Sequence, residues 1–157
     1  MSAEDKKLYH CFESGIQPGT IIQPGRFGRR IFADGIAHRR WSAELIYEIV
    51  RFEHYSNSPS RLYCNYLIEG LEAARFYIQR MAPEWVIYEA RIVNSGAPTH
   101  RTDFNLIQPL HGTDTWIDAA HKYWRHSTTV TIKDIPSLNC IEILVSSPVE
   151  LLNPVLD

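Results

Sequence analysis

The sequence has few cysteines, no long apolar run and no excess of charge of either sign. Three cysteines in 157 residues, with no CxxC pair, provide neither a disulfide framework nor the spacing of a zinc site. No apolar run reaches the roughly 20 residues of a membrane helix. Residues 1–7 lack the basic start and apolar run of a secretory signal. We therefore expect reduced thiols, a cytoplasmic location and no membrane partner.

The sequence also lacks the short motifs of several enzyme classes. It contains neither GxGxxG nor GxxxxGK[ST], the usual glycine-rich cradles for dinucleotides and triphosphates. The GxSxG and HExxH motifs are absent as well. The formal net charge of −2 does not favour attraction of the whole surface to nucleic acid or anionic lipid.

The length and composition are those of one globular domain over residues 1–157. Hydrophobic residues make up 45% and charged residues 22%, which is enough to build a core. Alternating and helical patterns mix without a regular βαβα repeat, which favours the α+β class. We expect a loop at 24–30, strands at 7–12, 20–22, 61–68, 84–93, 102–107 and 140–153, and helices at 41–55, 69–81 and 115–125.

Basic residues gather in two segments. The first follows the turn at residues 24–25 and consists of Arg26, Arg29 and Arg30. Guanidinium groups suit phosphate oxygens, although a solvated basic loop explains the same pattern. The second consists of His38, Arg39 and Arg40. It can contribute to a patch for RNA or DNA, or simply begin a charged helix.

Four segments, in their order along the chain, carry a resemblance to a known superfamily. They are LYHCF, PSRLYCNYLIEGLEAARFY, AAHKYWR and CIEILVSSPVEL. Their layout resembles the His–Tyr–Glu arrangement of ADP-ribosyltransferases, most closely a bacterial branch related to the DNA-modifying toxins. The resemblance implies an ADP-ribosyltransferase-like fold of split antiparallel β-sheets with flanking helices. It also implies that the first strand and the strand carrying the Glu lie side by side.

The resemblance implies a transferase that moves ADP-ribose from NAD to a macromolecular acceptor, either nucleic acid or protein. It further implies a toxin or phage-defence effector that is restrained by an antitoxin or regulatory protein. Two alternatives stay open: an NAD glycohydrolase, which uses water as acceptor, and an inactive module that binds NAD or ADP-ribose. Cys140 stands two residues before Glu142, where arginine-modifying members carry a carboxylate, so arginine is disfavoured as the acceptor.

The resemblance also implies roles for individual residues. Glu142 would bind the ribose 2′-hydroxyl and stabilise the positive charge that develops on the sugar. His10 would hold the adenosine-side ribose, and the Cys11 backbone would bind the nicotinamide amide. Tyr63 would stack on the nicotinamide ring, with Tyr66 as the competing stacker.

Several of these residues have structural alternatives. Glu142 interrupts an apolar strand and can simply face solvent. His10 can be a core histidine bonded to a backbone carbonyl, and Tyr63 can be a core tyrosine. Arg61 of the PSR segment either contacts the phosphates of NAD or pairs with Glu48.

Overall fold

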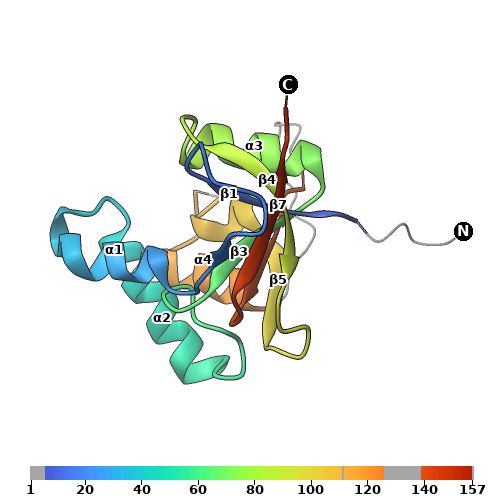
Figure 1. The fold of residues 1–157 in the computed structure, drawn as a ribbon. Coiled ribbons are helices and arrows are strands. Elements are labelled where there is room, and N and C mark those ends of the chain that lie inside the picture. The colour runs from blue at the N-terminus through green and yellow to red at the C-terminus, as the bar shows by residue number, and fades with distance from the viewer. Residues whose placement is uncertain (1–5, 111, 126–138, 157) are drawn as a thin grey trace, which may run out of the picture.

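The computed structural model describes residues 6–110, 112–125 and 139–156, which form an α+β arrangement (Figure 1). The strands are β1 Leu8–Phe12, β2 Ile21–Ile22, β3 Asn65–Glu69, β4 Val86–Ile92, β5 Thr99–Asp103, β6 Ile141–Val145 and β7 Val149–Pro154. The α-helices are α1 Arg26–Asp34, α2 Trp41–His54, α3 Leu71–Met81 and α4 Trp116–Trp124. Two short 3-10 helices, η1 and η2, cover Gly35–Ala37 and Phe104–Ile107.

All the described strands pair in antiparallel fashion in one sheet, in the order β2-β7-β4-β1-β3-β6-β5. The expectation of two separate sheets is therefore wrong, but the join at the centre is narrow. Strand β1 pairs with β4 along its whole length, whereas it pairs with β3 only through Leu8–Glu69 and Tyr9–Ile68. Beyond Tyr9 the two strands diverge. Strand β3 also lies between β1 and β6, so the strand of Glu142 is not beside the first strand as expected.

The two faces of the sheet bury different apolar clusters. On β4, Ile87 belongs to the cluster under the helices, while Tyr88 and Ala90 belong to the second cluster, as the alternation at residues 84–93 predicts. The second cluster joins residues of both halves of the sheet, including Leu67 of β3 and Leu151 of β7. Each such fully buried side chain contributes roughly 1.5–3 kcal/mol of transfer free energy.

Helices α2, α3 and α4 confirm the helices expected at residues 41–55, 69–81 and 115–125. Helix α3 packs on β1, β3 and β4, while α4 packs on α2 and β5. Helix α4 begins with a capping box, in which the Thr115 hydroxyl and the Asp118 carboxylate each accept a backbone N–H from the other residue.

Three local expectations were wrong. The segment at 24–30 is no loop, because helix α1 begins at Arg26 directly after Gly25, whose φ of 92° turns the chain into the helix. The strand expected at 61–68 begins only at Asn65, since residues 61–64 form a turn. The strand expected at 102–107 ends at Asp103, where the side chain accepts the Asn105 N–H and starts a 3-10 helix.

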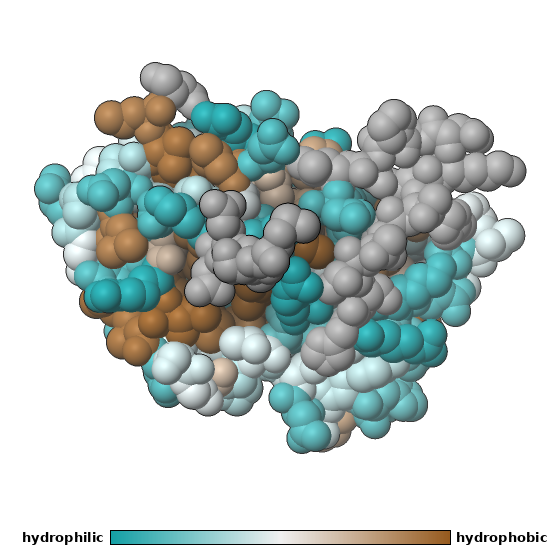
Figure 2. All heavy atoms as spheres, turned by 90° about the vertical axis from the view of Figure 1, so that its right-hand side faces the viewer, coloured by the Kyte–Doolittle hydropathy of each residue, from teal (hydrophilic) through white to brown (hydrophobic). Residues whose placement is uncertain are grey.

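On the face shown in Figure 2, apolar side chains gather on one side, and the other described side chains in this view are mostly polar. The described surface exposes several large apolar residues, among them Ile21, Val93 and Leu156. None of the helices in the described ranges combines the length and the apolar character that crossing a bilayer requires.

Candidate functional site

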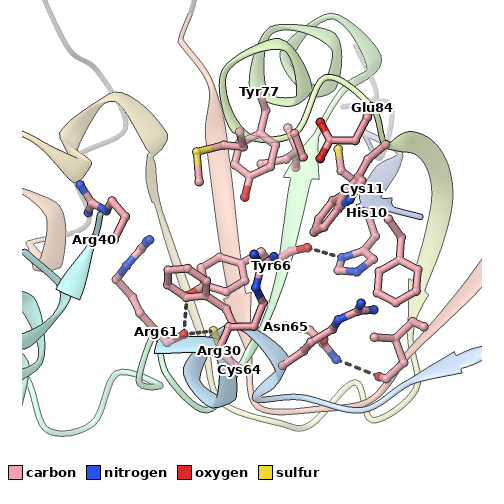
Figure 3. Close-up of a pocket in the computed structure, with 18 of the residues that line it drawn as sticks. His10, Cys11, Arg30, Arg40, Arg61, Cys64, Asn65, Tyr66, Tyr77 and Glu84 are labelled. Carbon is pink, nitrogen blue, oxygen red and sulfur yellow. Dashed lines mark hydrogen bonds between the residues drawn. The ribbon is translucent and has the colours of Figure 1, made fainter. Parts of the chain in front are cut away.

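A cavity of about 230 Å³ opens where β1 and β3 diverge (Figure 3). Three parts of the chain far apart in sequence form its walls: strand β1, the segment from β2 to the start of α2, and the chain from Arg61 to the start of β4. Its described lining includes five arginines, Arg26, Arg30, Arg39, Arg40 and Arg61. Within the described part of the chain, Arg30 and Arg39 have no acidic partner. The cavity therefore presents positive charge to a ligand.

His10 lies at the cavity and is bonded to a backbone carbonyl. Its ring Nδ1 is 2.7 Å from the carbonyl oxygen of Tyr66, just beyond the last paired residues of β1 and β3. Because the carbonyl can only accept, Nδ1 donates and Nε2 is left as an acceptor in the neutral ring. Burial lowers the pKa of His10, the Tyr66 bond opposes that shift, and the charge of Arg26 adds to it. The expectation of a buried histidine bonded to a backbone carbonyl is therefore confirmed, and the ligand-holding role of His10 stays a prediction.

We expect His10→Gln to reduce the loss of stability on acidification. Because the pKa of His10 is lowered in the folded protein, the unfolded chain binds the proton more readily. The stabilising contribution is complete above the unfolded value of about 6.5 and is lost as the pH falls towards the folded pKa.

The measurement is the free energy of unfolding from urea titrations at about pH 7.5 and about pH 5.5. Between these two pH values the free energy should fall more in wild type than in His10→Gln. Equal losses in the two proteins would contradict the prediction. The pKa of His121 is also lowered, by burial and then by the charge of His54, but this contribution is common to both proteins.

Arg61 is buried at the centre of an ion-pair network. Its guanidinium donates to both oxygens of Glu44, at 2.9 and 3.2 Å, and to Oε2 of Glu142 at 3.0 Å. Arg40 joins the network through Glu44, at 3.1 and 3.3 Å. Burial alone would raise the pKa of Glu44, but Arg61 and Arg40 outweigh it and hold that pKa below its usual range. Two positive and two negative side chains therefore compensate one another in the interior.

Glu48 was expected to pair with Arg61, but the partner in the structure is Glu44, one helical turn earlier on α2. Glu48 instead binds Arg51, with the closest nitrogen–oxygen distance at 2.7 Å, and accepts the Ser60 hydroxyl at 2.8 Å. Glu44 and Glu48 are four residues apart on α2 and share a helix face, so the sequence alone does not separate them. Tertiary packing decides the choice, because it buries Glu44 completely.

Glu142 is buried and lies outside the described lining of the cavity. Its Oε2 accepts the Tyr123 hydroxyl at 2.6 Å in addition to Arg61. Within the described residues, Oε1 has no hydrogen-bond partner. Burial, and then the charge of Glu142, raises the pKa of Tyr77, which does line the cavity. The solvent-facing interpretation of Glu142 is therefore wrong, and the carboxylate lies behind the cavity wall.

The two expected stacking residues have different positions. Tyr66 lines the cavity, and its hydroxyl donates to the Arg61 carbonyl. Tyr63 is 62% exposed and outside the lining, since it lies in the turn before β3 with its ring 6.3 Å from that of Phe32. Neither the stacking role nor the core interpretation of Tyr63 fits this position.

Of the remaining expected ligand-binding residues, two line the cavity and one lies outside its described lining. Arg26 lines the cavity and pairs with Glu13, whereas Arg29 is exposed and outside the described lining. Cys11 lines the cavity, and burial raises the pKa of its thiol to about 12, so the thiol stays protonated. In the ranges that the structure describes, no cluster of three or more His, Cys, Asp or Glu side chains is placed to hold a metal ion.

A family model described as a protein of unknown function (DUF2441) matches residues 27–156. No curated protein matches the chain. The matched range includes Arg61 and Glu142, while His10 and Cys11 precede it.

Proposed function

The chain belongs to the family described as a protein of unknown function (DUF2441), and from its cavity we propose that it is an NAD-dependent ADP-ribosyltransferase. The observation that carries this proposal is a cavity lined both by the ring of His10 and by arginines of α1, of the segment before α2 and of the turn before β3. Guanidinium groups are suited to phosphate oxygens, and NAD contains a pyrophosphate. The neutral His10 ring offers Nε2 to a ribose hydroxyl.

The size of the cavity suits part of a dinucleotide. Its 230 Å³ lies below the usual range for ligand pockets, about 300–1,000 Å³. In the proposed complex one end of NAD enters the cavity, and the pyrophosphate lies against Arg26 and Arg30 on α1. Backbone N–H groups of the first turn of α1, which begins at Arg26, add to the favourable field for an anion.

The proposed reaction breaks the bond between C1′ of the ribose and the nicotinamide nitrogen. The electron pair of that bond leaves with nicotinamide, and C1′ gains positive charge. The carboxylate of Glu142 would stabilise that charge, and an acceptor nucleophile would bond to C1′ and lose its proton. Because Arg61 lies between Glu142 and the cavity, this role requires Arg61 to shift, and the pyrophosphate is a suitable partner for it.

A binding module without turnover is the second candidate, and the burial of Glu142 favours it. The carboxylate is fully buried and already holds Arg61 and Tyr123. If Arg61 does not shift when NAD binds, the cavity retains its affinity for the dinucleotide but has no carboxylate at the ribose.

Labelled NAD mixed with cell extract, RNA or DNA tests the transferase proposal. Wild type should transfer label to one of these fractions, and Glu142→Gln, which keeps an acceptor oxygen for Arg61, should transfer about tenfold less or none. Glu72→Gln, on the exposed first turn of α3, is the matched control. Nicotinamide release without an acceptor would identify a glycohydrolase instead. Binding without release in any of the three proteins would identify the binding module.

Neighbouring arginines of α1 provide a test of NAD binding by itself. Arg30 lines the cavity and Arg29 does not, although both are exposed. Arg30→Ala should weaken ADP-ribose binding by about five- to tenfold in calorimetry, since it removes a charge-assisted contact. Arg29→Ala should leave the affinity unchanged. Equal effects of the two substitutions would contradict the assignment of the pyrophosphate to this wall.

A further inference from the structure

The cavity has a second end, built by the turn between α3 and β4. Helix α3 ends at Met81, and the Trp85 N–H donates to the Ala82 carbonyl at 3.0 Å, which closes a four-residue turn. Pro83 occupies the second position of this turn, where its ring fixes the backbone φ. Glu84 is therefore presented by a rigid turn, and Figure 3 shows it at the rim of the cavity beside Cys11 and Tyr77.

The two ends of the cavity carry opposite charge. Among the described lining residues, Glu84 is the single carboxylate against five arginines. Figure 3 shows Glu84 on the side away from Arg30, Arg40 and Arg61. Glu84 is exposed and has no ion-pair partner within the described part of the chain. The carboxyl end of α3 adds partial negative charge at this end, whereas the amino end of α1 adds partial positive charge at the other.

The Glu84 end is also the more apolar end of the cavity. Tyr77 and Met81 of α3 line it together with Trp85. The Trp85 ring lies 6.1 Å from the ring of Phe12, which marks the border with the basic end because the Arg26 guanidinium lies over it at 4.3 Å from the ring centroid. A flat, partly apolar group with positive charge would bury its ring against Tyr77, Met81 and Trp85 and keep its charge near Glu84.

We propose that Glu84 is a specificity residue that selects the oxidised, positively charged nicotinamide ring, so that the cavity binds NAD⁺ in preference to NADH. This inference rests on the proposed function, which puts the pyrophosphate at the arginines. The two forms have the same phosphates and riboses, and the nicotinamide ring carries a positive charge only in NAD⁺. The charge of the nicotinamide ring is therefore the difference between NAD⁺ and NADH that the Glu84 carboxylate can recognise.

Calorimetric titration of the full chain with NAD⁺, NADH and ADP-ribose tests the inference. Wild type should bind NAD⁺ about tenfold more tightly than NADH, which corresponds to about 1.4 kcal/mol. Glu84→Gln keeps the shape of the side chain, removes its charge, and should bring the two affinities within about twofold by weakening NAD⁺. ADP-ribose, which lacks the nicotinamide, should bind both proteins equally. Glu72→Gln is the control, as an exposed glutamate of α3 outside the described lining.

The outcomes separate this inference from the function on which it rests. If neither NAD⁺ nor ADP-ribose binds wild type, the proposed function fails and the inference fails with it. If both bind but Glu84→Gln leaves the ratio of NAD⁺ to NADH affinity unchanged, the role of Glu84 is wrong and the proposed function stands. If Glu84→Gln weakens ADP-ribose as much as NAD⁺, the adenine rather than the nicotinamide occupies this end, which also overturns the inference.

Discussion

Arg61→Ala is expected to lower the free energy of unfolding by about 3–5 kcal/mol, because it removes one member of a buried ion-pair network. Arg61 is 3% exposed, and Glu44 and Glu142 are both fully buried. Glu44 would keep Arg40 as a partner, but Glu142 would keep only the Tyr123 hydroxyl within the described residues. A charged carboxylate without a cationic partner in the interior is the main cause of the expected loss.

Urea denaturation of Arg61→Ala, Arg61→Lys and Arg91→Ala provides the measurement. Arg61→Lys keeps the charge but loses the planar fork that reaches two carboxylates, so its loss should be intermediate. Arg91 forms an exposed pair with Glu150, and Arg91→Ala should cost less than about 1 kcal/mol. If Arg61→Ala lowered the free energy of unfolding no more than Arg91→Ala, the buried network would not stabilise the protein more than an exposed ion pair does.

Gly28→Ala is expected to destabilise the protein by about 3 kcal/mol, although it lies inside helix α1, where alanine is ordinarily the better residue. A Cβ at position 28 would lie 1.8 Å from the carbonyl oxygen of Leu62 and 2.6 Å from the carbonyl carbon. These are backbone atoms of the turn before β3, so no side chain can rotate away. Helix α1 must therefore move, at the cost typical of severe overpacking or more.

The same change should affect the cavity. Helix α1 carries Arg26 and Arg30, so a displaced helix changes the positions of both guanidinium groups in the cavity wall. We expect ADP-ribose binding to fall more than tenfold where the protein remains folded. Gly96→Ala is the matched control, because its Cβ would meet only the Asn94 side chain at 3.6 Å. A gain in stability for Gly28→Ala would show that helix propensity outweighs the contact with Leu62.

Arg61→Ala and Gly28→Ala both disturb the turn at residues 61–64. The turn at residues 61–64 presents Leu62 to α1, Arg61 to the buried carboxylates and the Arg61 carbonyl to the Tyr66 hydroxyl. Because these contacts belong to one short segment, loss of Arg61 and displacement of α1 should alter the same wall of the cavity.

The sequence predicted the regular elements where one local pattern dominates. Residues 84–93 alternate over a full strand, and the two sides of β4 join different clusters as expected. Helix α1 was missed because Arg26, Phe27 and Gly28 follow a Pro-Gly turn and include a poor helix former. At Gly28 that helix approaches the backbone of Leu62 too closely for a Cβ, and this approach involves residues far apart in sequence.

By itself the sequence determined the α+β class and the three longer helices, and it identified two segments rich in basic residues. These follow from periodicity and composition, which are local properties of the chain. Only the tertiary structure decided which of the basic residues reach the cavity, that Glu44 rather than Glu48 binds Arg61, and that Glu142 is buried behind Arg61. The physical reason is that burial and pairing of charges depend on which distant segments pack together, and identical side chains one turn apart on a helix differ only in that packing.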